Sequence, residues 1–195
     1  MVGRPRQFDA DVALDTAMRL FWSRGYKATG LSNLIEETGV AKQSLYNTFG
    51  HKKTFFLKTL ELYRETVAQS FIDRIRAGEP TIDSLRTLLT EWSEGARSAE
   101  PFGCFLTNTA AEVGKRDPEI SAFLRKSHDM TEAAFVEALE SGQQKGEIRA
   151  DKDAQRLARG LITSANGLMV LSKLDLPEEE YADAIEATLM MLEPC

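Results

Sequence analysis

Five polar side chains gather between residues 42 and 47, and their types suit contacts with DNA. They are Lys42, Gln43, Ser44, Tyr46 and Asn47. An amide presents a hydrogen-bond donor and an acceptor together, which matches the edge of adenine, and a lysine ammonium reaches guanine or phosphate. Hydroxyl groups donate to phosphate oxygens. A solvated polar face on a small helix is the alternative explanation for this cluster.

Two short helical patterns must position these residues. The first runs from about Leu31 to Thr38 and is followed by Gly39, a residue type that commonly closes a helix. The second spans about 42–49, with Leu45 and Phe49 directed inward. A helix this short is unstable alone, so we expect an apolar partner to hold it. The pair predicts a helix-turn-helix whose second helix enters a groove of DNA.

The rest of the chain also has a helical pattern. Asp9 is placed to cap a first helix near residues 10–24. Further helices are expected at about 52–77, 82–99, 104–113, 118–145, 153–174 and 177–192. We find no strand pattern and predict an all-α fold of about nine helices. The expected domains are a head that holds the helix-turn-helix (1–52) and a larger helical body (53–195).

Charge is divided unevenly along the sequence. Residues 1–60 carry 9 Lys and Arg against 5 Asp and Glu, whereas the remainder carries 15 against 25. A basic head on an acidic body suits a nucleic-acid contact confined to one end. Cys104 and Cys195 are the only cysteines, which is too few for a disulfide framework and favours a reducing cytoplasm. No apolar run reaches 18 residues, so we expect no membrane span.

The stretch from Arg4 to about Leu60 resembles the TetR family of bacterial transcriptional regulators. The resemblance rests on the order Gly-Val-Ala-x-x-Ser-Leu-Tyr-x-x-Phe-x-x-Lys, from Gly39 to Lys52. It implies a three-helix DNA-binding head (1–52) and a larger helical body for ligand binding and dimerisation (53–195). It also implies a dimeric, ligand-responsive repressor on a pseudo-palindromic operator of double-stranded DNA, and an activator is the alternative. Gly30 departs from the family pattern, because many relatives carry Ser or Thr there and can bind phosphate with that hydroxyl.

The resemblance also implies roles for residues of the head. Those expected to contact DNA are Arg4, Arg6, Thr29, Lys42, Gln43, Ser44, Tyr46, Asn47 and Lys52. Lys52 matches a phosphate-binding lysine, and the two arginines match a basic arm that can reach the minor groove. Other roles stay open for some of them. Thr29 can cap the second helix, Tyr46 can pack between helices, and the arm can be a disordered tail.

The body offers candidates for a small-molecule pocket, with plain core packing as the competing explanation. They are Trp92, Phe102, Cys104, Phe105, Asn108, His128 and Phe135. The Phe102-Gly103-Cys104 run resembles a Gly-Cys segment of one subset of the family. A thiol near a helix start suits a sensor of oxidants or electrophiles, and a small buried apolar residue is the alternative for Cys104.

Two apolar stripes near the C-terminus are candidates for a homodimer interface, although the protein's own core explains them equally. They are made by Leu157, Leu161, Ala165, Leu168, Ile185, Leu189 and Leu192. We expect an unidentified small-molecule effector and no metal or other cofactor. An enzyme with Cys104 and His128 as nucleophile and base is the opposing hypothesis, and a protein-binding adaptor is a third. No Gly-rich phosphate cradle or carboxylate dyad supports an enzyme, so we predict none.

Overall fold

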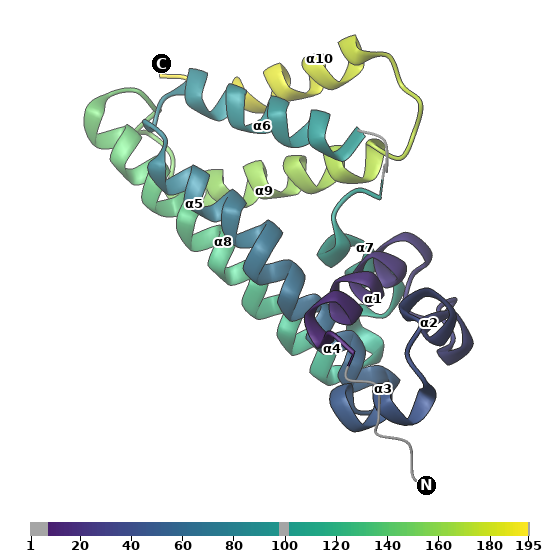
Figure 1. Cartoon of the computed structure of the whole chain (residues 1–195). Helices are drawn as coiled ribbons and strands as arrows, with labels where there is room; N and C mark the ends of the chain where they lie inside the picture. Colours follow the sequence, from purple (N-terminus) through teal and green to yellow (C-terminus); the bar gives the residue numbers. More distant parts are fainter. Residues whose placement is uncertain (1–7, 98–101, 195) are drawn as a thin grey trace, which may run out of the picture. The chain divides into compact units, whose positions relative to one another are not determined.

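The computed structural model describes residues 8–97 and 102–194 and is helical across them, with no strand (Figure 1). The α-helices are α1 (Ala10–Arg24), α2 (Leu31–Thr38), α3 (Lys42–Phe49), α4 (Lys52–Tyr63), α5 (Gln69–Ala77), α6 (Ile82–Arg97), α7 (Phe105–Glu112), α8 (Pro118–Lys145), α9 (Ala154–Leu171) and α10 (Glu178–Leu189). A π-helical stretch, η1 (Arg64–Ala68), joins α4 to α5 without a break, and η2 (Gly114–Arg116) precedes α8. Counting α4 to α5 as one, these residues form nine α-helices, and the all-α prediction is confirmed.

The chain divides into two compact units, Met1–Thr66 and Val67–Cys195. The sequence placed the boundary earlier, after residue 52. It lies later because α4 packs along α1 and belongs to the core of the first unit. Phe56 and Leu60 of α4 have no exposed surface. The head is therefore a four-helix unit in which α4 supports the helix-turn-helix.

Aromatic side chains fill the core of the head. The ring of Phe21 in α1 meets that of Phe56 edge-on, with centroids 4.9 Å apart. Phe49 in α3 stacks on Phe55 in α4, with centroids at 4.3 Å. Such pairs are stabilising beyond the apolar area that they bury, by about 0.5–1.5 kcal/mol. They tie α1 and α3 to the same helix.

The predicted cap of the first helix is confirmed. Asp9 lies just before α1 in an extended conformation. Its carboxylate accepts hydrogen bonds from the backbone N–H groups of Asp11 and Val12, at 3.0 and 3.2 Å. These donors have no partner within the helix, and a side-chain cap of this kind stabilises a helix by about 1 kcal/mol.

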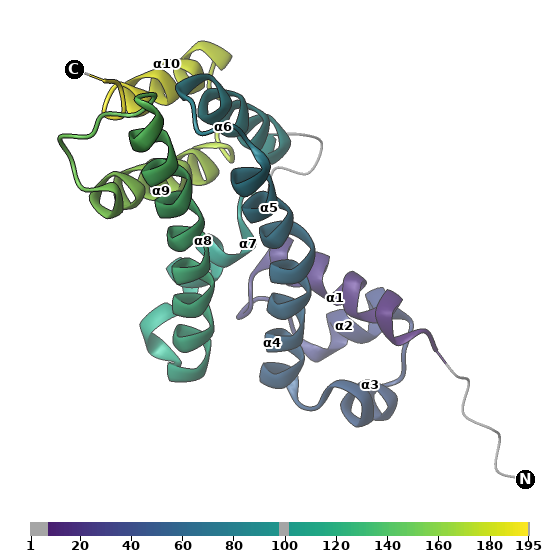
Figure 2. The same ribbon diagram turned by 90° about the vertical axis from the view of Figure 1, so that its left-hand side faces the viewer.

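The body, by itself, is built on α5 and α8, which run side by side (Figures 1 and 2). Helix α9 packs on α8 and α10, and α10 also packs on α6. A single apolar cluster collects side chains from α5, α6, α8, α9 and α10. Among the described residues, no helix combines the length and apolar character needed to cross a membrane.

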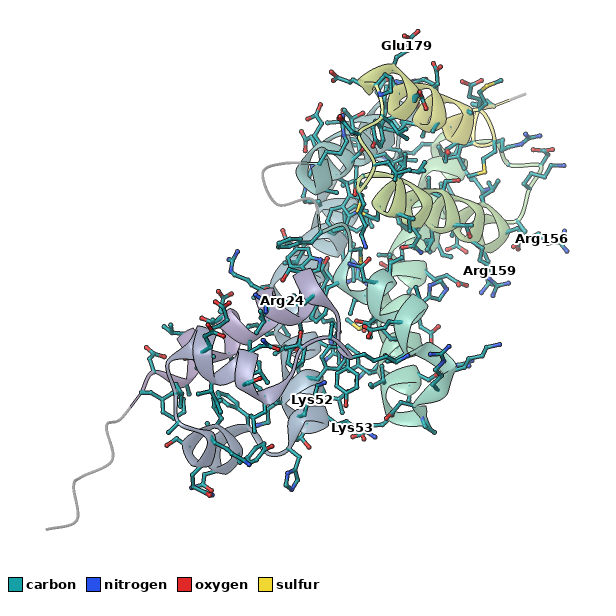
Figure 3. All side chains as sticks on the ribbon, turned by 90° about the vertical axis from the view of Figure 1, so that its right-hand side faces the viewer. Arg24, Lys52, Lys53, Arg156, Arg159 and Glu179 are labelled. Carbon is teal, nitrogen blue, oxygen red and sulfur yellow. The ribbon has the colours of Figure 1, made fainter. Side chains whose placement is uncertain are left out.

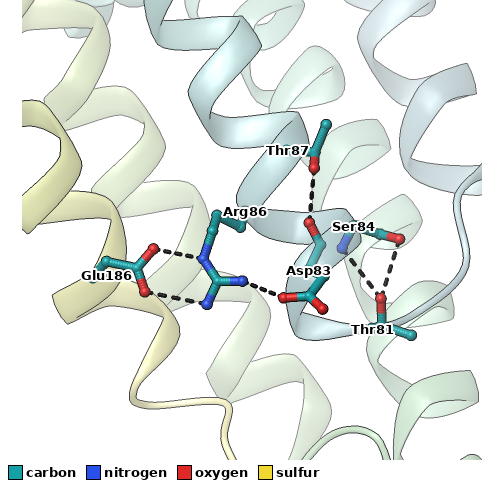
Figure 4. A network of polar contacts seen from close by, with 6 residues as sticks. All are labelled: Thr81, Asp83, Ser84, Arg86, Thr87 and Glu186. Atoms are coloured by element: carbon teal, nitrogen blue, oxygen red, sulfur yellow. Dashed lines mark hydrogen bonds and ion pairs between the residues drawn. The ribbon is translucent and has the colours of Figure 1, made fainter.

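A polar network fastens α10 to α6 at the surface of the body (Figure 4). The guanidinium of Arg86 donates to both carboxylate oxygens of Glu186, at 2.6 and 3.2 Å, and also to Asp83. Hydrogen bonding to Arg86 is the largest cause that lowers the pKa of Glu186 below its ordinary value. A lowered carboxyl pKa contributes stability at neutral pH that disappears as the pH falls through that pKa. Solvent exposure of the pair keeps this contribution small.

Gly142 allows α8 to approach the side chain of Ile148 and the backbone of Pro80 closely. A Cβ atom at this position would lie 2.5 Å from Cγ1 of Ile148 and 2.7 Å from the carbonyl oxygen of Pro80. A carbonyl oxygen cannot move aside without shifting the chain that carries it. The C-terminal end of α8 therefore packs as it does because residue 142 has no side chain.

Gly142→Ala should lower the free energy of unfolding by about 1–3 kcal/mol, the usual cost of overpacking a core. Gly95→Ala is the matched control, because Gly95 is also helical but a Cβ atom there would have no neighbour within 4 Å. It should raise stability by about 0.5–1 kcal/mol through reduced chain entropy. Urea denaturation of both variants measures the difference. Equal shifts would contradict the proposed close contact.

Candidate nucleic-acid interface

The turn between α2 and α3 depends on Gly39. This residue adopts the left-handed conformation with φ +66°, which L side chains rarely accept. Its N–H donates to the carbonyl of Ile35 at 3.0 Å and closes α2, as the sequence predicted. Val40 is then buried, and α3 begins at Lys42. The turn thus sets where the polar side chains of α3 start.

Helix α3 has one buried side and one exposed side. Leu45 and Phe49 are buried in the head, as predicted. Lys42, Gln43 and Asn47 are exposed. The helix is only 8 residues long, too short for stability without its buried contacts. The exposed side chains of α3 therefore do not belong to the core and are available to a ligand.

Four polar side chains on α3 form two pairs, each spanning one helical turn. The Nε2 group of Gln43 donates a hydrogen bond to Oδ1 of Asn47 at 2.9 Å. The ammonium of Lys42 lies 5.7 Å from the ring centre of Tyr46. Contacts between residues four apart are favourable because their side chains share a helix face. The face that would meet DNA is therefore partly ordered.

Tyr46 shows the packing role that the sequence left open, and its phosphate contact stays a prediction. It is half-buried, and its ring meets that of His51 nearly edge-on, with centroids 5.3 Å apart. Ser44, also half-buried, lies in the first turn of α3. Packing of the ring fixes the direction of the phenol, so a phosphate contact from its hydroxyl stays compatible with this position.

Lys52 is the first residue of α4 (Figure 3). Its ammonium lies 4.6 Å from the ring centre of Tyr26, a cation–π contact that holds the side chain. The positive end of the helix dipole and the backbone N–H groups of the first turn also favour an anion here. Lys53 follows it directly (Figure 3). The start of α4 is therefore suited to an anion, and the phosphate contact expected of Lys52 stays a prediction.

Thr29 does not cap α2, which corrects one of the sequence predictions. The cap position is Gly30, whose N–H donates to Oδ1 of Asn33 at 2.8 Å. Thr29 has no exposed surface, and its hydroxyl donates to the carbonyl of Gly25 at 2.7 Å. The hydroxyl therefore stabilises the loop after α1 instead of facing a phosphate. The predicted basic arm, Arg4 and Arg6, lies outside the described residues.

Two family models match the sequence and cover both units. The model described as bacterial regulatory proteins, tetR family, matches residues 13–59. The model described as tetracyclin repressor-like, C-terminal domain, matches residues 81–188. The chain belongs to the TetR family.

Relatives match over nearly the full length of this TetR-family chain. YezE, an uncharacterized HTH-type transcriptional regulator of Bacillus subtilis (strain 168), is 29% identical over 194 residues, covering 98% of this chain and 100% of YezE. ComR, an HTH-type transcriptional repressor of Escherichia coli (strain K12), is 30% identical over 191 residues, covering 97% and 91%. A cysteine mutant of the TetR family transcriptional regulator CifR, complexed with 26-base-pair double-strand operator DNA, has a TM-score of 0.86 and 29% identity, covering 97% of this chain and 100% of that one. These proteins are transcriptional regulators and not enzymes.

The structure divides the predicted pocket residues of the body into separate groups. The rings of Trp92 and Phe71 pack together at a tilt of 32°, with centroids 4.1 Å apart, and Phe135 meets the ring of Phe71 at 6.0 Å. Phe135 and Phe105 are buried, so both contribute to the core. His128 makes a different contact, because its Nε2 lies 3.4 Å from a carboxylate oxygen of Glu132. The hypothetical Cys104–His128 pair of an enzyme thus has no support in these contacts.

The remaining pocket candidates, Phe102, Cys104 and Asn108, meet near the start of α7. Lys173, which the sequence did not predict, joins them there. The side-chain amide of Asn108 donates to the carbonyl of Phe102 at 2.7 Å and accepts from the ammonium of Lys173. Cys104 is the half-buried cap residue of α7. Partial burial lowers the pKa of Lys173, and the charge of Cys104 acts in the opposite direction. No sequence signal joins residues so far apart in the chain.

The seven predicted dimer residues are all buried within a single chain. Leu157, Leu161, Ala165, Leu168, Ile185, Leu189 and Leu192 belong to the apolar cluster of the body. The sequence left a homodimer interface and the protein's own core as explanations, and these side chains lie in the core. Val170 near the end of α9, Leu174 after α9 and Met190 after α10 are exposed instead. Dimerisation itself is typical of the TetR family.

Lys52→Ala should weaken binding to every DNA sequence alike and reduce the slope of log affinity against log salt by about 1, because one phosphate contact is lost. Titrations of specific and random duplexes at several salt concentrations measure both effects. Lys58→Ala is the control, since it removes the same charge from an exposed position further along α4. A similar slope change in both variants would assign the effect to overall charge.

Proposed function

We propose that this TetR-family protein is a dimeric repressor that leaves a pseudo-palindromic operator when a small molecule binds its body or a reagent modifies Cys104. The exposed face of α3, with its paired polar side chains, is the observation that carries the proposal. ComR is named a repressor, and the CifR structure contains operator DNA, which supports the same role here. Action on DNA would place the protein in the cytoplasm.

Exposed apolar side chains on α9 and its following turn support a second copy as the partner. Val170 and Leu174 are 52% and 54% exposed, and Met190 after α10 is 65% exposed. Gly167 shares the open side of α9, where a Cβ atom would have nothing within 4 Å. A two-fold dimer would present two α3 helices to half-sites about 34 Å apart, one turn of DNA.

Gly167→Glu should convert the dimer to a monomer without harming the fold of the single chain. A glutamate has room in the isolated chain, but it would bring a charge into a dry interface. Sedimentation velocity at micromolar concentration measures the assembly state, and thermal unfolding checks the fold. Gly95→Glu on α6 is the control, because its surroundings are equally open. A dimer that survives Gly167→Glu would exclude this face.

Buried polar atoms in the body support a small-molecule effector. The hydroxyl of Ser93 and Nε of Arg97, one turn apart on α6, are buried and lack hydrogen-bond partners within the described chain. The Arg97 guanidinium lies over the ring of Tyr181, 4.4 Å from its centre. Unsatisfied buried polar groups cost about 1–3 kcal/mol each. A bound molecule with acceptor atoms would remove that cost and favour one arrangement of the body.

The surroundings of Cys104 support a thiol-reactive signal as the second route to release. The residue is only half-buried, and the ammonium of Lys173 is close enough to interact with it electrostatically. A half-buried thiol is accessible to electrophiles and oxidants, which modify cysteine side chains. Modification would place a new group among Phe102, Asn108 and Lys173, whose contacts hold the start of α7.

Alkylation with N-ethylmaleimide should release the wild-type protein from its operator and leave Cys104→Ser bound. Cys195 remains in that variant and controls for modification elsewhere. Footprinting on the intergenic DNA upstream of the protein's own coding sequence reports binding, and mass spectrometry reports modification. Release of Cys104→Ser by the same treatment would exclude Cys104 as the sensor and leave small-molecule binding as the cause of release.

A reporter gene placed downstream of the footprinted DNA distinguishes a repressor from an activator. Lower expression in the presence of the protein supports repression, and higher expression supports an activator. Absence of any sequence preference for the intact protein would contradict the proposed operator.

A further inference from the structure

The amide pair on α3 has a consequence for which base the helix reads. Gln43 and Asn47 are both exposed on the outer face of α3. A hydrogen bond from Nε2 of Gln43 to Oδ1 of Asn47, at 2.9 Å, joins their side chains. It uses one of the two N–H groups of Gln43, and the side-chain carbonyl of Gln43 takes no part in it.

Hydrogen-bond counting connects this arrangement to adenine. In the major groove, adenine offers one donor, its N6 amino group, and one acceptor, N7, whereas guanine offers two acceptors, O6 and N7. With one N–H engaged by Asn47, Gln43 retains one donor and one acceptor. That set matches adenine. Contacting both acceptors of guanine would require the second N–H and would break the bond to Asn47.

We propose that Asn47 acts as a positioning residue that makes Gln43 selective for adenine over guanine. Asn47 holds the amide plane of Gln43, and Gln43 contacts the base. This inference rests on the proposed operator binding. A side chain ordered before binding also loses less conformational freedom on DNA, which favours affinity as well as selectivity.

The first measurement identifies the base pair that Gln43 reads. Selection from a random duplex pool with the full-length protein gives the preferred sequence, and the same selection with Gln43→Ala shows which position loses its preference. Replacing adenine by 7-deazaadenine at that position should weaken the wild-type protein and leave Gln43→Ala unaffected. An unaltered selection with Gln43→Ala would remove Gln43 from base readout and overturn the inference.

The second measurement tests Asn47 at that same base pair. The wild-type protein should prefer adenine over guanine by about fivefold or more, since a bidentate contact discriminates by at least about this factor. Asn47→Ala should reduce the ratio to about twofold. Asn47→Asp should restore the ratio, because a carboxylate also accepts from Gln43, while binding to all sequences weakens through repulsion of phosphates. Thr48→Ala, exposed on the same helix, controls for an alanine substitution that leaves the amide pair intact.

The outcomes separate this inference from the proposed function. An unchanged adenine-to-guanine ratio in Asn47→Ala would overturn the positioning role while operator binding stands. Lost preference at a different base pair would show that Asn47 reads its own base, and would also overturn it. A wild-type protein without sequence preference would instead contradict the operator itself. The double variant Gln43→Ala/Asn47→Ala should be no less selective at this base pair than Gln43→Ala alone, because the two residues act as one unit.

Discussion

The stack of Phe49 on Phe55 is the contact on which the DNA-binding face depends. Helix α3 is too short to persist alone, and its only buried side chains are Leu45 and Phe49. The ring of Phe55 anchors it to α4, which the contact between Phe21 and Phe56 fixes to α1. Every polar group on α3 takes its position from this aromatic packing. The orientation of the recognition face is thus decided by apolar residues that never touch DNA.

The body follows a different principle, in which charge supplements a large apolar core. Its helices bury leucine, isoleucine and aromatic side chains in one cluster. Ion pairs such as Arg86–Glu186 and Arg76–Glu137 then join helices across the surface. Exposed pairs add little stability each. The buried polar atoms of Ser93 and Arg97 are the exception, because they carry a desolvation cost that the apolar packing does not remove.

Sequence reasoning succeeded where structure depends on local spacing. The polar run from Lys42 to Asn47, the glycine turn at Gly39 and the inward residues of α3 follow from helical periodicity. It failed where a side chain had several partners within reach. The hydroxyl of Thr29 bonds backward to Gly25 and not forward as a cap, and a sequence pattern cannot rank those two bonds. Lys173 beside Cys104 depends on how α7 and α9 pack, which spacing along the chain does not encode.

The separation of buried and exposed positions on α3 has an evolutionary consequence. Leu45 and Phe49 are buried and hold the helix in place, whereas Lys42, Gln43, Asn47 and Thr48 are exposed. Mutations at those outward positions can alter the DNA sequence that is recognised while stability stays nearly constant. A duplicated copy of the gene could therefore acquire a new set of target promoters through few substitutions. The same property would let an engineer exchange the outward residues of α3 and retain the remainder of the protein unchanged.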